Sequence, residues 1–237
     1  MKQEYANEIR EMSRTGYDAI APAFSRTRST FWDELLFVRD LLPKGGVILD
    51  VGCGNGRFLG ALEDKPLTYT GIDFSEGLIA FAKKEHHARP HANFIVGDAL
   101  ALPFQNHTFD VAVSFAVLHH IPSHAYRVQF LQEAKRVITP RGIIVLTAWN
   151  VWRSKPRTVL WYALKKIAGM TKLDFGDALL GFDTNKKVRF VHALTMREIR
   201  TLAREAGLMV ERLEKIRRPS GEENFFVILK NAKVEPS

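Results

Sequence analysis

Short apolar runs separated by amphipathic stretches organise the chain between residues 47 and 147. The run Val47–Val51 is apolar apart from one acid, a pattern typical of a parallel strand that is covered on both faces. Four further runs predict strands: Tyr69–Ile72, Phe94–Val96, Val111–Phe115 and Ile143–Thr147. The intervening stretches predict two helices, one capped by Ser75 and ending near Lys84, and one over Ser123–Val137. Alternating strands and helices predict an α/β fold with a doubly wound, mostly parallel sheet.

The flanking segments add elements to this core. Tyr17–Arg28 predicts a short element that ends near Pro22, followed by a loop carrying two arginines. Phe31–Leu42 has helical spacing and stops at a Pro-Lys-Gly-Gly sequence. The remaining expected elements are a helix starting at Arg57–Leu62, a turn over Thr139–Gly142, a helix over Thr195–Gly207, and strands near Leu208–Leu213 and Phe225–Leu229. Because no long helix separates the last two strands, we expect an antiparallel last strand.

Length and composition place the chain among ordinary globular proteins. Its 237 residues suit a single domain over 1–237, with an N-terminal cap over 1–43 and an insertion over about 151–190. The longest apolar runs, such as Ile143–Trp149, are too short to span a bilayer, and Met1–Arg10 lacks the apolar core of a signal peptide. Cys53 is the only cysteine, which excludes an intrachain disulfide and fits a cytoplasmic location.

The net charge of +8 is concentrated in the insertion. Residues 151–190 contain nine lysines and arginines against three aspartates. A basic segment of this kind predicts a polyanionic partner, nucleic acid first. With apolar runs this short, no membrane partner is expected. The alternative is a solvated surface whose lysines serve solubility.

Three glycines follow the first strand, at Gly52, Gly54 and Gly56. They predict a tight turn in which a ligand lies against bare backbone before a helix begins. Nicotinamide, flavin and S-adenosylmethionine (SAM) proteins share such a turn, and a plain strand-to-helix turn is the alternative.

Three acids accompany this turn. Asp73 ends the second strand at the spacing expected for a carboxylate that accepts hydrogen bonds from ribose hydroxyls. Asp98 follows the third strand and is placed to accept a hydrogen bond from an adenine amine. The alternative is that Asp98 caps a helix or turn. Asp50 is placed to orient the glycine turn or a cofactor amino group. For Asp73, the alternative is an aspartate in an exposed loop.

The order of these motifs resembles class I SAM-dependent methyltransferases, whose fold is Rossmann-like. The resemblance covers residues 47–147 and rests on Leu49–Gly56, Gly71–Ser75, Gly97–Asp98 with Leu102–Phe104, and Phe109–Val111 through Leu118–His120. It implies SAM as the cofactor. The implied cofactor-binding residues are Tyr17, Asp50, Gly52, Gly54, Gly56, Asp73, Phe74, Asp98, Ala99 and Ser114.

A narrower resemblance extends to both ends of the chain. Tyr17–Arg28 with Trp32, the Ala116–His120 run with Arg127, and Arg189–His192 look like eukaryotic tRNA wobble carboxymethyluridine methyltransferases. These enzymes methylate a carboxylate on the modified uridine and work with a small activator protein. The resemblance implies catalytic roles for His119, His120, Arg26 and Arg28, and substrate contacts by Arg127, Trp149, Arg189, His192 and Asn224. The chain departs from the pattern at Asp33, Val128 and Val191.

No metal is expected at the adjacent histidines, because neither a cysteine nor paired carboxylates join them. One histidine is expected to be packed and the other to face the cleft at the end of the fourth strand. Arg26, Arg28, Arg189 and His192 are candidates for an anion site, and Trp149 for stacking on a base or for core packing.

These observations predict a SAM-dependent methyltransferase that acts on tRNA by forming a methyl ester. A carboxylate acceptor would need no general base, since it is already ionised at neutral pH. The alternatives are a methyltransferase acting on a small molecule, a SAM-binding regulator without catalysis, and a nicotinamide oxidoreductase.

Overall fold

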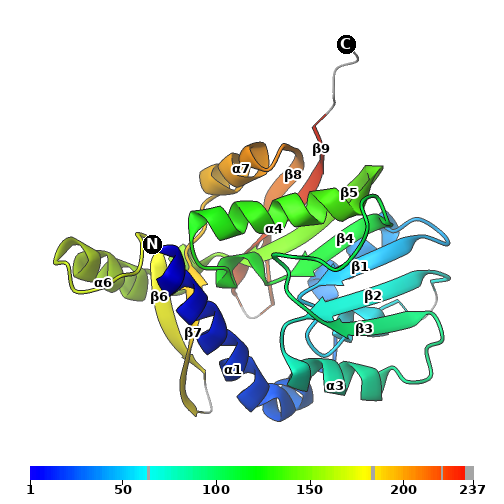
Figure 1. Ribbon diagram of the computed structural model, residues 1–237, viewed down its shortest axis with the longest axis horizontal. Helices are drawn as coiled ribbons and strands as arrows, with labels where there is room; N and C mark the ends of the chain where they lie inside the picture. The colour runs from blue at the N-terminus through cyan, green and yellow to red at the C-terminus, as the bar shows by residue number, and fades with distance from the viewer. Residues whose placement is uncertain (63–64, 183–184, 220, 233–237) are drawn as a thin grey trace.

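The structure, a computed structural model, describes residues 1–62, 65–182, 185–219 and 221–232. A seven-stranded sheet with the order β3-β2-β1-β4-β5-β9-β8 forms its centre (Figure 1). The strands are β1 (Val47–Val51), β2 (Thr68–Asp73), β3 (Ala92–Val96), β4 (Phe109–Phe115), β5 (Ile138–Trp149), β8 (Leu208–Arg217) and β9 (Glu223–Asn231). All neighbours pair in parallel except β9, which is antiparallel to both β5 and β8. The mostly parallel α/β sheet with an antiparallel last strand is confirmed.

Helices cover both faces of this sheet. The helical elements before β5 are α1 (Gln3–Thr27), the 3-10 helix η1 (Asp33–Leu41), α2 (Arg57–Gly60), α3 (Glu76–Glu85), the 3-10 helix η2 (Leu118–His120) and α4 (His124–Val137). Those after β5 are α5 (Val151–Ser154), α6 (Pro156–Ile167) and α7 (Met196–Glu205). The predicted cap at Ser75 is confirmed, since Ser75 accepts a hydrogen bond from the Leu78 amide. Ser123, predicted as the start of the next helix, caps α4 by accepting from the Tyr126 amide.

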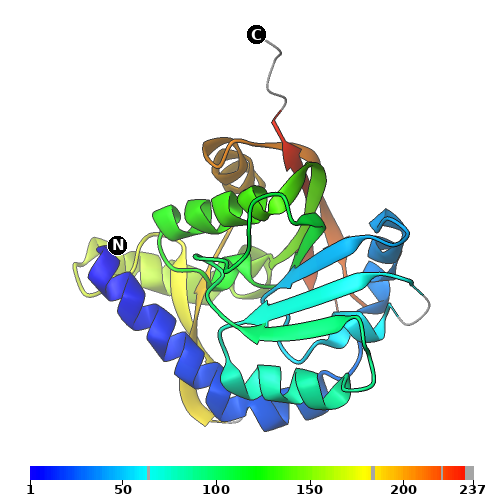
Figure 2. The same cartoon turned by 45° about the vertical axis from the view of Figure 1, so that its right-hand side comes forward.

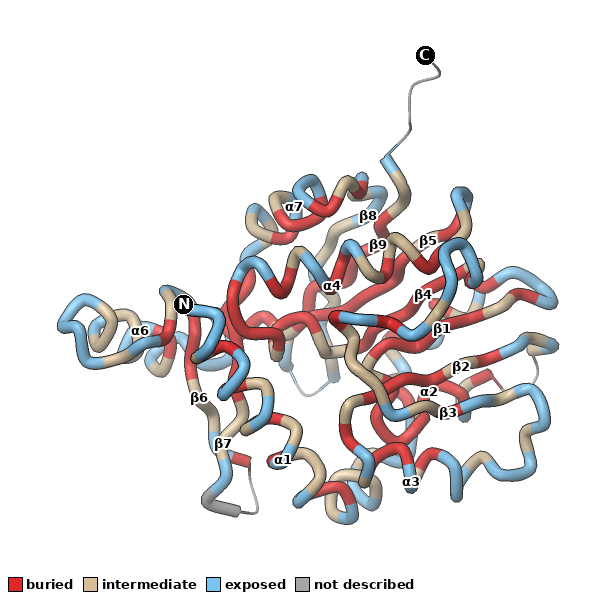
Figure 3. Tube along the Cα trace, in the orientation of Figure 1, coloured by how far each residue is buried: buried red, intermediate tan, exposed pale blue. Residues whose placement is uncertain are grey.

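Two cores form because successive residues of a strand face opposite sides of the sheet. Leu49 and Ala112 pack in one core with α4 and α7, whereas Ile48 and Val111 pack in the other with η1, α2 and α3. The central strands are accordingly buried along most of their length (Figure 3).

The N-terminal helix differs from its prediction. α1 continues through Pro22 to Thr27, where the sequence predicts an end near Pro22 and a loop. A proline inside a helix costs about 3 kcal/mol, but the buried face of α1, which includes Ile9, Gly16 and Ile20, packs against the body of the protein and offsets this cost. Asp18, in the turn before Pro22, is also held by hydrogen bonds from Ser75 Oγ at 2.6 Å and Gly77 N at 3.1 Å.

Three other predictions need correction. Phe31–Leu42 contains the 3-10 helix η1 rather than an α-helix, and the helix beginning at Arg57 ends at Gly60. The turn predicted at Thr139–Gly142 is instead an irregularity inside β5, where Ile138 pairs with Phe109 and Ile143 with Val111. The backbone there remains extended because both ends stay paired to β4.

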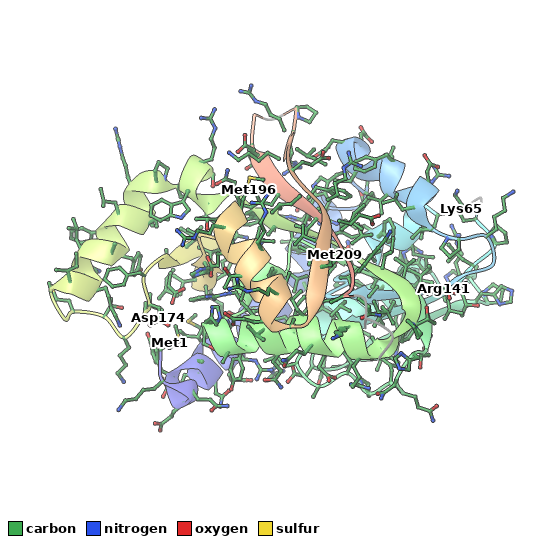
Figure 4. All side chains as sticks on the ribbon, turned by 90° about the horizontal axis from the view of Figure 1, so that it is seen from above. Met1, Lys65, Arg141, Asp174, Met196 and Met209 are labelled. Carbon is green, nitrogen blue, oxygen red and sulfur yellow. The ribbon has the colours of Figure 1, made fainter. Side chains whose placement is uncertain are left out.

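The basic segment contains an element that the sequence analysis does not predict. After α5 and α6, the strands β6 (Asp177–Phe182) and β7 (Asn185–His192) form a separate antiparallel pair. This hairpin lies beside α1 (Figures 1 and 2). Its base is tied to the N-terminus by Asp174, which accepts a hydrogen bond from the Met1 amino group at 2.6 Å (Figure 4). Within the described ranges, no helix is both long enough and apolar enough to cross a bilayer.

Candidate active site

A cavity of about 960 Å³ lies at the carboxyl ends of the parallel strands. Its residues come from the ends of β1, β2, β4 and β5, and from α1 and the β6–β7 hairpin on the opposite side. The chain runs from β1 to β2 in one direction and to β4 in the other, and such reversals are where doubly wound sheets bind ligands.

The glycine turn forms one end of this cavity. Gly52, Gly54 and Gly56 have positive φ angles of 76°, 58° and 78°. A Cβ on Gly52 would meet Val117 at 2.4 Å, and one on Gly56 would meet Phe94 at 2.9 Å. Gly52 and Gly54 line the cavity, whereas Gly56 does not, so its role is to allow close packing.

Asp73 is fixed beside this turn. Its two oxygens accept hydrogen bonds from the amides of Gly54 and Ser75, each at 2.9 Å. Burial raises the pKa of Asp73 to about 6, although these amides act in the opposite direction. The carboxylate therefore has a fixed orientation at the cavity wall and retains lone pairs for the hydroxyls of a ribose.

Asp50 and Asp98 also line the cavity. Asp50 accepts a hydrogen bond from Tyr69 Oη at 2.6 Å, and burial raises its pKa to about 7. Asp98 accepts from the Leu100 amide at 2.9 Å and pairs with Arg10 at 2.5 Å. The capping role left open for Asp98 is thus present, and Arg10 is a cavity residue that the sequence analysis did not find.

The other predicted cofactor residues separate into two groups. Tyr17, Phe74 and Ala99 line the cavity. Ser114 lies outside its lining, where Ser114 Oγ donates to the Val51 carbonyl at 2.8 Å and joins β4 to β1.

His120 faces the cavity in a defined tautomer. Its Nδ1 lies 2.7 Å from the Phe190 carbonyl oxygen. Because a carbonyl oxygen can only accept a hydrogen bond, Nδ1 carries the proton. Nε2 therefore accepts from Tyr17 Oη, 3.1 Å away. Burial lowers the pKa of His120 to about 4, so the ring is neutral at physiological pH.

His119 is the packed member of the pair. It is fully buried, stacks on Trp149 with ring centroids 4.6 Å apart, and accepts from the Trp149 amide at 3.2 Å. Burial holds its pKa well below the usual value. His119 lies outside the cavity lining and can act only through the position of Trp149 and His120.

Arg189 enters the cavity from the hairpin. Its guanidinium carbon lies 4.8 Å from the ring centre of Trp149 and 5.2 Å from that of Phe182. Its Nε is buried without a hydrogen-bond partner among the described residues. Arg26 and Arg28 line the cavity as well. Phe182 was not predicted, because no sequence pattern indicated the hairpin that carries it.

Three predicted substrate residues lie away from the cavity lining. His192 is bound by Asp177 at 2.6 Å and Glu198 at 2.9 Å, so it does not join the anion site with Arg189. Burial opposes protonation of His192, but the hydrogen bonds to these carboxylates outweigh it and raise its pKa. Arg127 is buried, donating to the Ile121 carbonyl at 3.0 Å and pairing with Glu198 at 3.4 Å.

Asn224 is the third of these residues. It lies in β9 opposite Trp149 and is 8% exposed. Across the described parts of the chain, no group of three His, Cys, Asp or Glu side chains has an arrangement that could hold a metal ion.

Comparison with known proteins defines the class. Residues 49–146 match the family described as a methyltransferase domain. The chain superimposes on a SAM-dependent methyltransferase from Methanosarcina mazei with a TM-score of 0.71 at 22% identity, covering 86% of this chain and 100% of that one. A structure of the Haloferax volcanii Trm112 methyltransferase activator with a putative methyltransferase also matches, with a TM-score of 0.71 at 18% identity, covering 95% and 100%. Residues 49–146 therefore form a methyltransferase domain, and the chain has the fold of class I SAM-dependent methyltransferases.

Two curated relatives share a more specific description. The tRNA (carboxymethyluridine(34)-5-O)-methyltransferase of Arabidopsis thaliana is 38% identical over 133 residues, covering 56% of this chain and 31% of the relative. Its Saccharomyces cerevisiae counterpart is 34% identical over 156 residues, covering 66% and 52%. The chain thus spans about a third to a half of the length of these relatives.

The cavity fits the cofactor of this class. The turn at Gly52 and Gly54 leaves backbone exposed where a Cβ would fill space, and Asp73 presents an oriented carboxylate. When bound, SAM supplies a methyl group made electrophilic by the sulfonium.

Proposed function

We propose that the chain methylates the carboxylate of a carboxymethylated wobble uridine in tRNA, forming a methyl ester. The two curated relatives, both described as tRNA (carboxymethyluridine(34)-5-O)-methyltransferases, support this substrate. Within the cavity, the environment of the Arg189 guanidinium is the main support for the proposal. A guanidinium between two aromatic rings, with a buried N–H left free, suits a planar anion attached to a flat base.

The residues around Arg189 suit an acceptor that needs no base. His120 is neutral, and its Nε2 already accepts from Tyr17 Oη, so it is poorly placed to remove a proton. An ionised carboxylate requires no such removal. Arg189 would hold the acceptor oxygens, while Trp149 and Phe182 would exclude water. Neutralisation of opposite charges in the transition state is then favoured by a dry cavity.

Association with tRNA also has electrostatic support. Arg26, in the last turn of α1, lines the cavity and is exposed, so it is available to the phosphates of a bound tRNA. A small activator protein is a further candidate partner, because the Haloferax volcanii match is a complex with the Trm112 activator.

The test is methyl transfer from radiolabelled SAM to bulk tRNA or to a small-molecule extract of the same cells. Label in tRNA that mild alkali releases as methanol, as expected for an ester, supports the proposal. Label confined to the small-molecule fraction would contradict it and favour a small-molecule methyltransferase. The Arg189→Gln variant should reduce labelling of tRNA while retaining SAM binding.

A further inference from the structure

Guanidinium groups gather around Trp32 at one end of the cavity. The guanidinium carbon of Arg57 lies 3.8 Å from the Trp32 ring centre, and that of Arg218 lies 5.5 Å from it. Arg28 lies 4.7 Å from the ring centre of Phe24. All three arginines line the cavity.

These arginines differ in how their charge is balanced. Arg218 donates to Glu34 at 2.9 Å and to Glu222 at 2.6 Å. Among the described residues, no ion pair joins Arg57 or Arg28 to a carboxylate. Burial and the neighbouring positive charges lower the pKa of Arg57 to about 10. The site therefore contains buried positive charge that an anion would stabilise.

This positive charge lies against the glycine turn. Asn55 Nδ2 donates to the Arg28 carbonyl at 3.0 Å, which fixes the end of α1 to the turn, and Arg57 directly follows Gly56. Asp50, at the start of the turn, interacts electrostatically with Arg57 without pairing to it. Asp50 and the two arginines that lack an ion pair among the described residues thus lie at the glycine turn, whereas Glu34 and Glu222 already pair with Arg218.

We propose that Arg28 and Arg57 bind the α-carboxylate of SAM, with Asp50 facing its α-ammonium group. With the ribose at Asp73, the methionine end of the cofactor extends along the turn, where each of its two charges meets an opposite one. Arg28 then belongs to the cofactor site rather than to the acceptor site predicted from the sequence. The inference depends on SAM alone and is independent of the tRNA acceptor.

Calorimetric titration with SAM and with decarboxylated SAM, which lacks only this carboxylate, tests the proposal. The wild-type protein should bind SAM about 10- to 100-fold more tightly than decarboxylated SAM, which is the effect of one or two charge-assisted hydrogen bonds. In Arg57→Gln and in Arg28→Gln, this ratio of the two affinities should fall to within a few-fold of one. Arg28→Gln is the safer variant for folding, because its side chain is only partly buried.

Arg218→Gln is the matched control. It removes a guanidinium beside the same tryptophan, but one that two glutamates already balance, so the ratio should stay at the wild-type value. A ratio unchanged in both Arg28→Gln and Arg57→Gln would overturn the proposal. Impaired tRNA labelling by Arg28→Gln with an unchanged ratio would return Arg28 to the acceptor site.

The surface of α6 carries a second, independent inference. Seven of the ten exposed large hydrophobic side chains of the described residues lie between 152 and 175: Trp152, Leu160, Trp161, Leu164, Ile167, Met170 and Phe175. Residues 151–173 contain six lysines and arginines and no acid. α6 lies at the edge of the molecule, away from the large sheet, in two perpendicular views (Figures 1 and 4).

The chemistry of this surface selects among possible occupants. A second copy of the chain would bring six cations against six. RNA would satisfy the cations and the tryptophans but not the aliphatic side chains Leu160, Leu164 and Ile167. An anionic lipid surface satisfies both, since it offers negative headgroups above an apolar layer. We infer that α6 docks on an anionic membrane surface without spanning it, which revises the expectation of no membrane contact.

Sedimentation with vesicles of phosphatidylcholine containing 30% phosphatidylglycerol tests this inference. Binding should be roughly 100-fold weaker to pure phosphatidylcholine, as expected from losing a few cation–headgroup contacts. Leu164→Glu with Ile167→Glu should weaken binding to the anionic vesicles by about 10-fold or more. Met209→Glu, which changes an exposed hydrophobic residue of β8, is the matched control and should have no effect.

Two results would overturn the membrane inference. One is equal binding to both vesicle types. The other is full binding by the Leu164→Glu, Ile167→Glu variant together with a flatter salt dependence of tRNA affinity in Arg157→Gln, Lys165→Gln. The second result would assign this surface to RNA phosphates.

Discussion

At the cofactor end of the cavity, Asp73 accepts a hydrogen bond from Gly54, 19 positions earlier in the chain. At the acceptor end, Tyr17 bonds to His120, 103 positions away, and His120 bonds to Phe190, a further 70 positions away. The glycine turn and Asp73 of the first end belong to one strand–turn–helix–strand unit, β1–α2–β2. The second exists only when α1, η2 and β7 have come together.

This difference has a physical consequence. Backbone geometry determines the cofactor end, because positive φ angles and close approaches at Gly52 and Gly56 leave few alternatives. Side-chain packing determines the acceptor end, where Phe182 lies 5.3 Å from Tyr17 and Arg189 stacks on Trp149. Substitutions in the hairpin can therefore change the acceptor while leaving the cofactor site intact.

The largest expected effect concerns Asp73. Asp73→Ala removes about two charge-assisted hydrogen bonds to the ribose, and SAM affinity should fall by roughly 2–4 kcal/mol. Calorimetric titration measures it. Arg189→Gln is the comparison at the acceptor end and should bind SAM normally. Unchanged SAM affinity in Asp73→Ala would remove the ribose assignment.

The next effect is on stability and belongs to the acceptor end. Because the pKa of His120 is about 4 in the folded state and near 6.5 in the unfolded chain, the unfolded state binds more protons between these values. The contribution of His120 should therefore be full above pH 6.5 and fall by about 3 kcal/mol as the pH drops to 4.

Urea unfolding of wild type and His120→Asn at pH 7 and pH 4.5 measures this contribution as a difference. The difference in the free energy of unfolding between wild type and His120→Asn should shrink or change sign as the pH falls. His124→Asn is the control, because His124 is half exposed and pairs with Glu205 at the surface. A pH-independent difference for His120→Asn would contradict the neutral buried ring.

Arg189 provides the third comparison. Arg189→Gln should raise the KM for tRNA by about 10- to 100-fold, since it removes charge-assisted contacts to the acceptor, with kcat less affected. Steady-state methylation with saturating SAM gives both constants. Arg10→Gln serves as the control, because Arg10 pairs with Asp98 at the other end of the cavity. An equal rise in the KM for tRNA in both variants would show that tRNA binding does not distinguish the two ends of the cavity.

The smallest expected effect is the dependence of the chemical step on pH. A carboxylate acceptor is ionised throughout pH 6–9, so single-turnover methyl transfer should be nearly flat over this range. His120→Asn should reduce the rate of single-turnover methyl transfer by less than about 10-fold. A rate that rises steeply through pH 6.5 and loses that rise in His120→Asn would indicate a protonated acceptor and a histidine base.

The sequence predicted the glycine turn, the cap at Ser75 and the place of Asp73 at the end of β2, because these signals are local. The glycines, Asp73 and the Ser75 cap follow from strand and turn patterns that a window of a few residues contains. Pro22 shows the limit of such windows, since the local rule ends a helix there and tertiary packing of α1 overrides it.

The residues of the acceptor end were predicted mainly by resemblance, and the structure places them unevenly. Arg189 and Trp149 do lie in the cavity, whereas His192 and Arg127 share a buried network with Glu198. All four are polar or aromatic residues in similar sequence surroundings. Arg189 and His192 both lie on β7, and which of these two faces the cavity depends on the register of a hairpin that the basic composition of the segment concealed.

Cys53 makes the glycine turn accessible to a chemical measurement. It is the single thiol of the chain, it is buried, and its Sγ lies 2.8 Å from where a Cβ on Gly71 would be. Burial raises the pKa of Cys53 well above the usual value, and although the residue lines the cavity it is only 7% exposed, so we expect alkylation to be slow unless the turn opens. The labelling rate of unmodified protein therefore records how often the turn opens, with no engineered probe. A ligand seated on the turn should slow that rate in proportion to its occupancy.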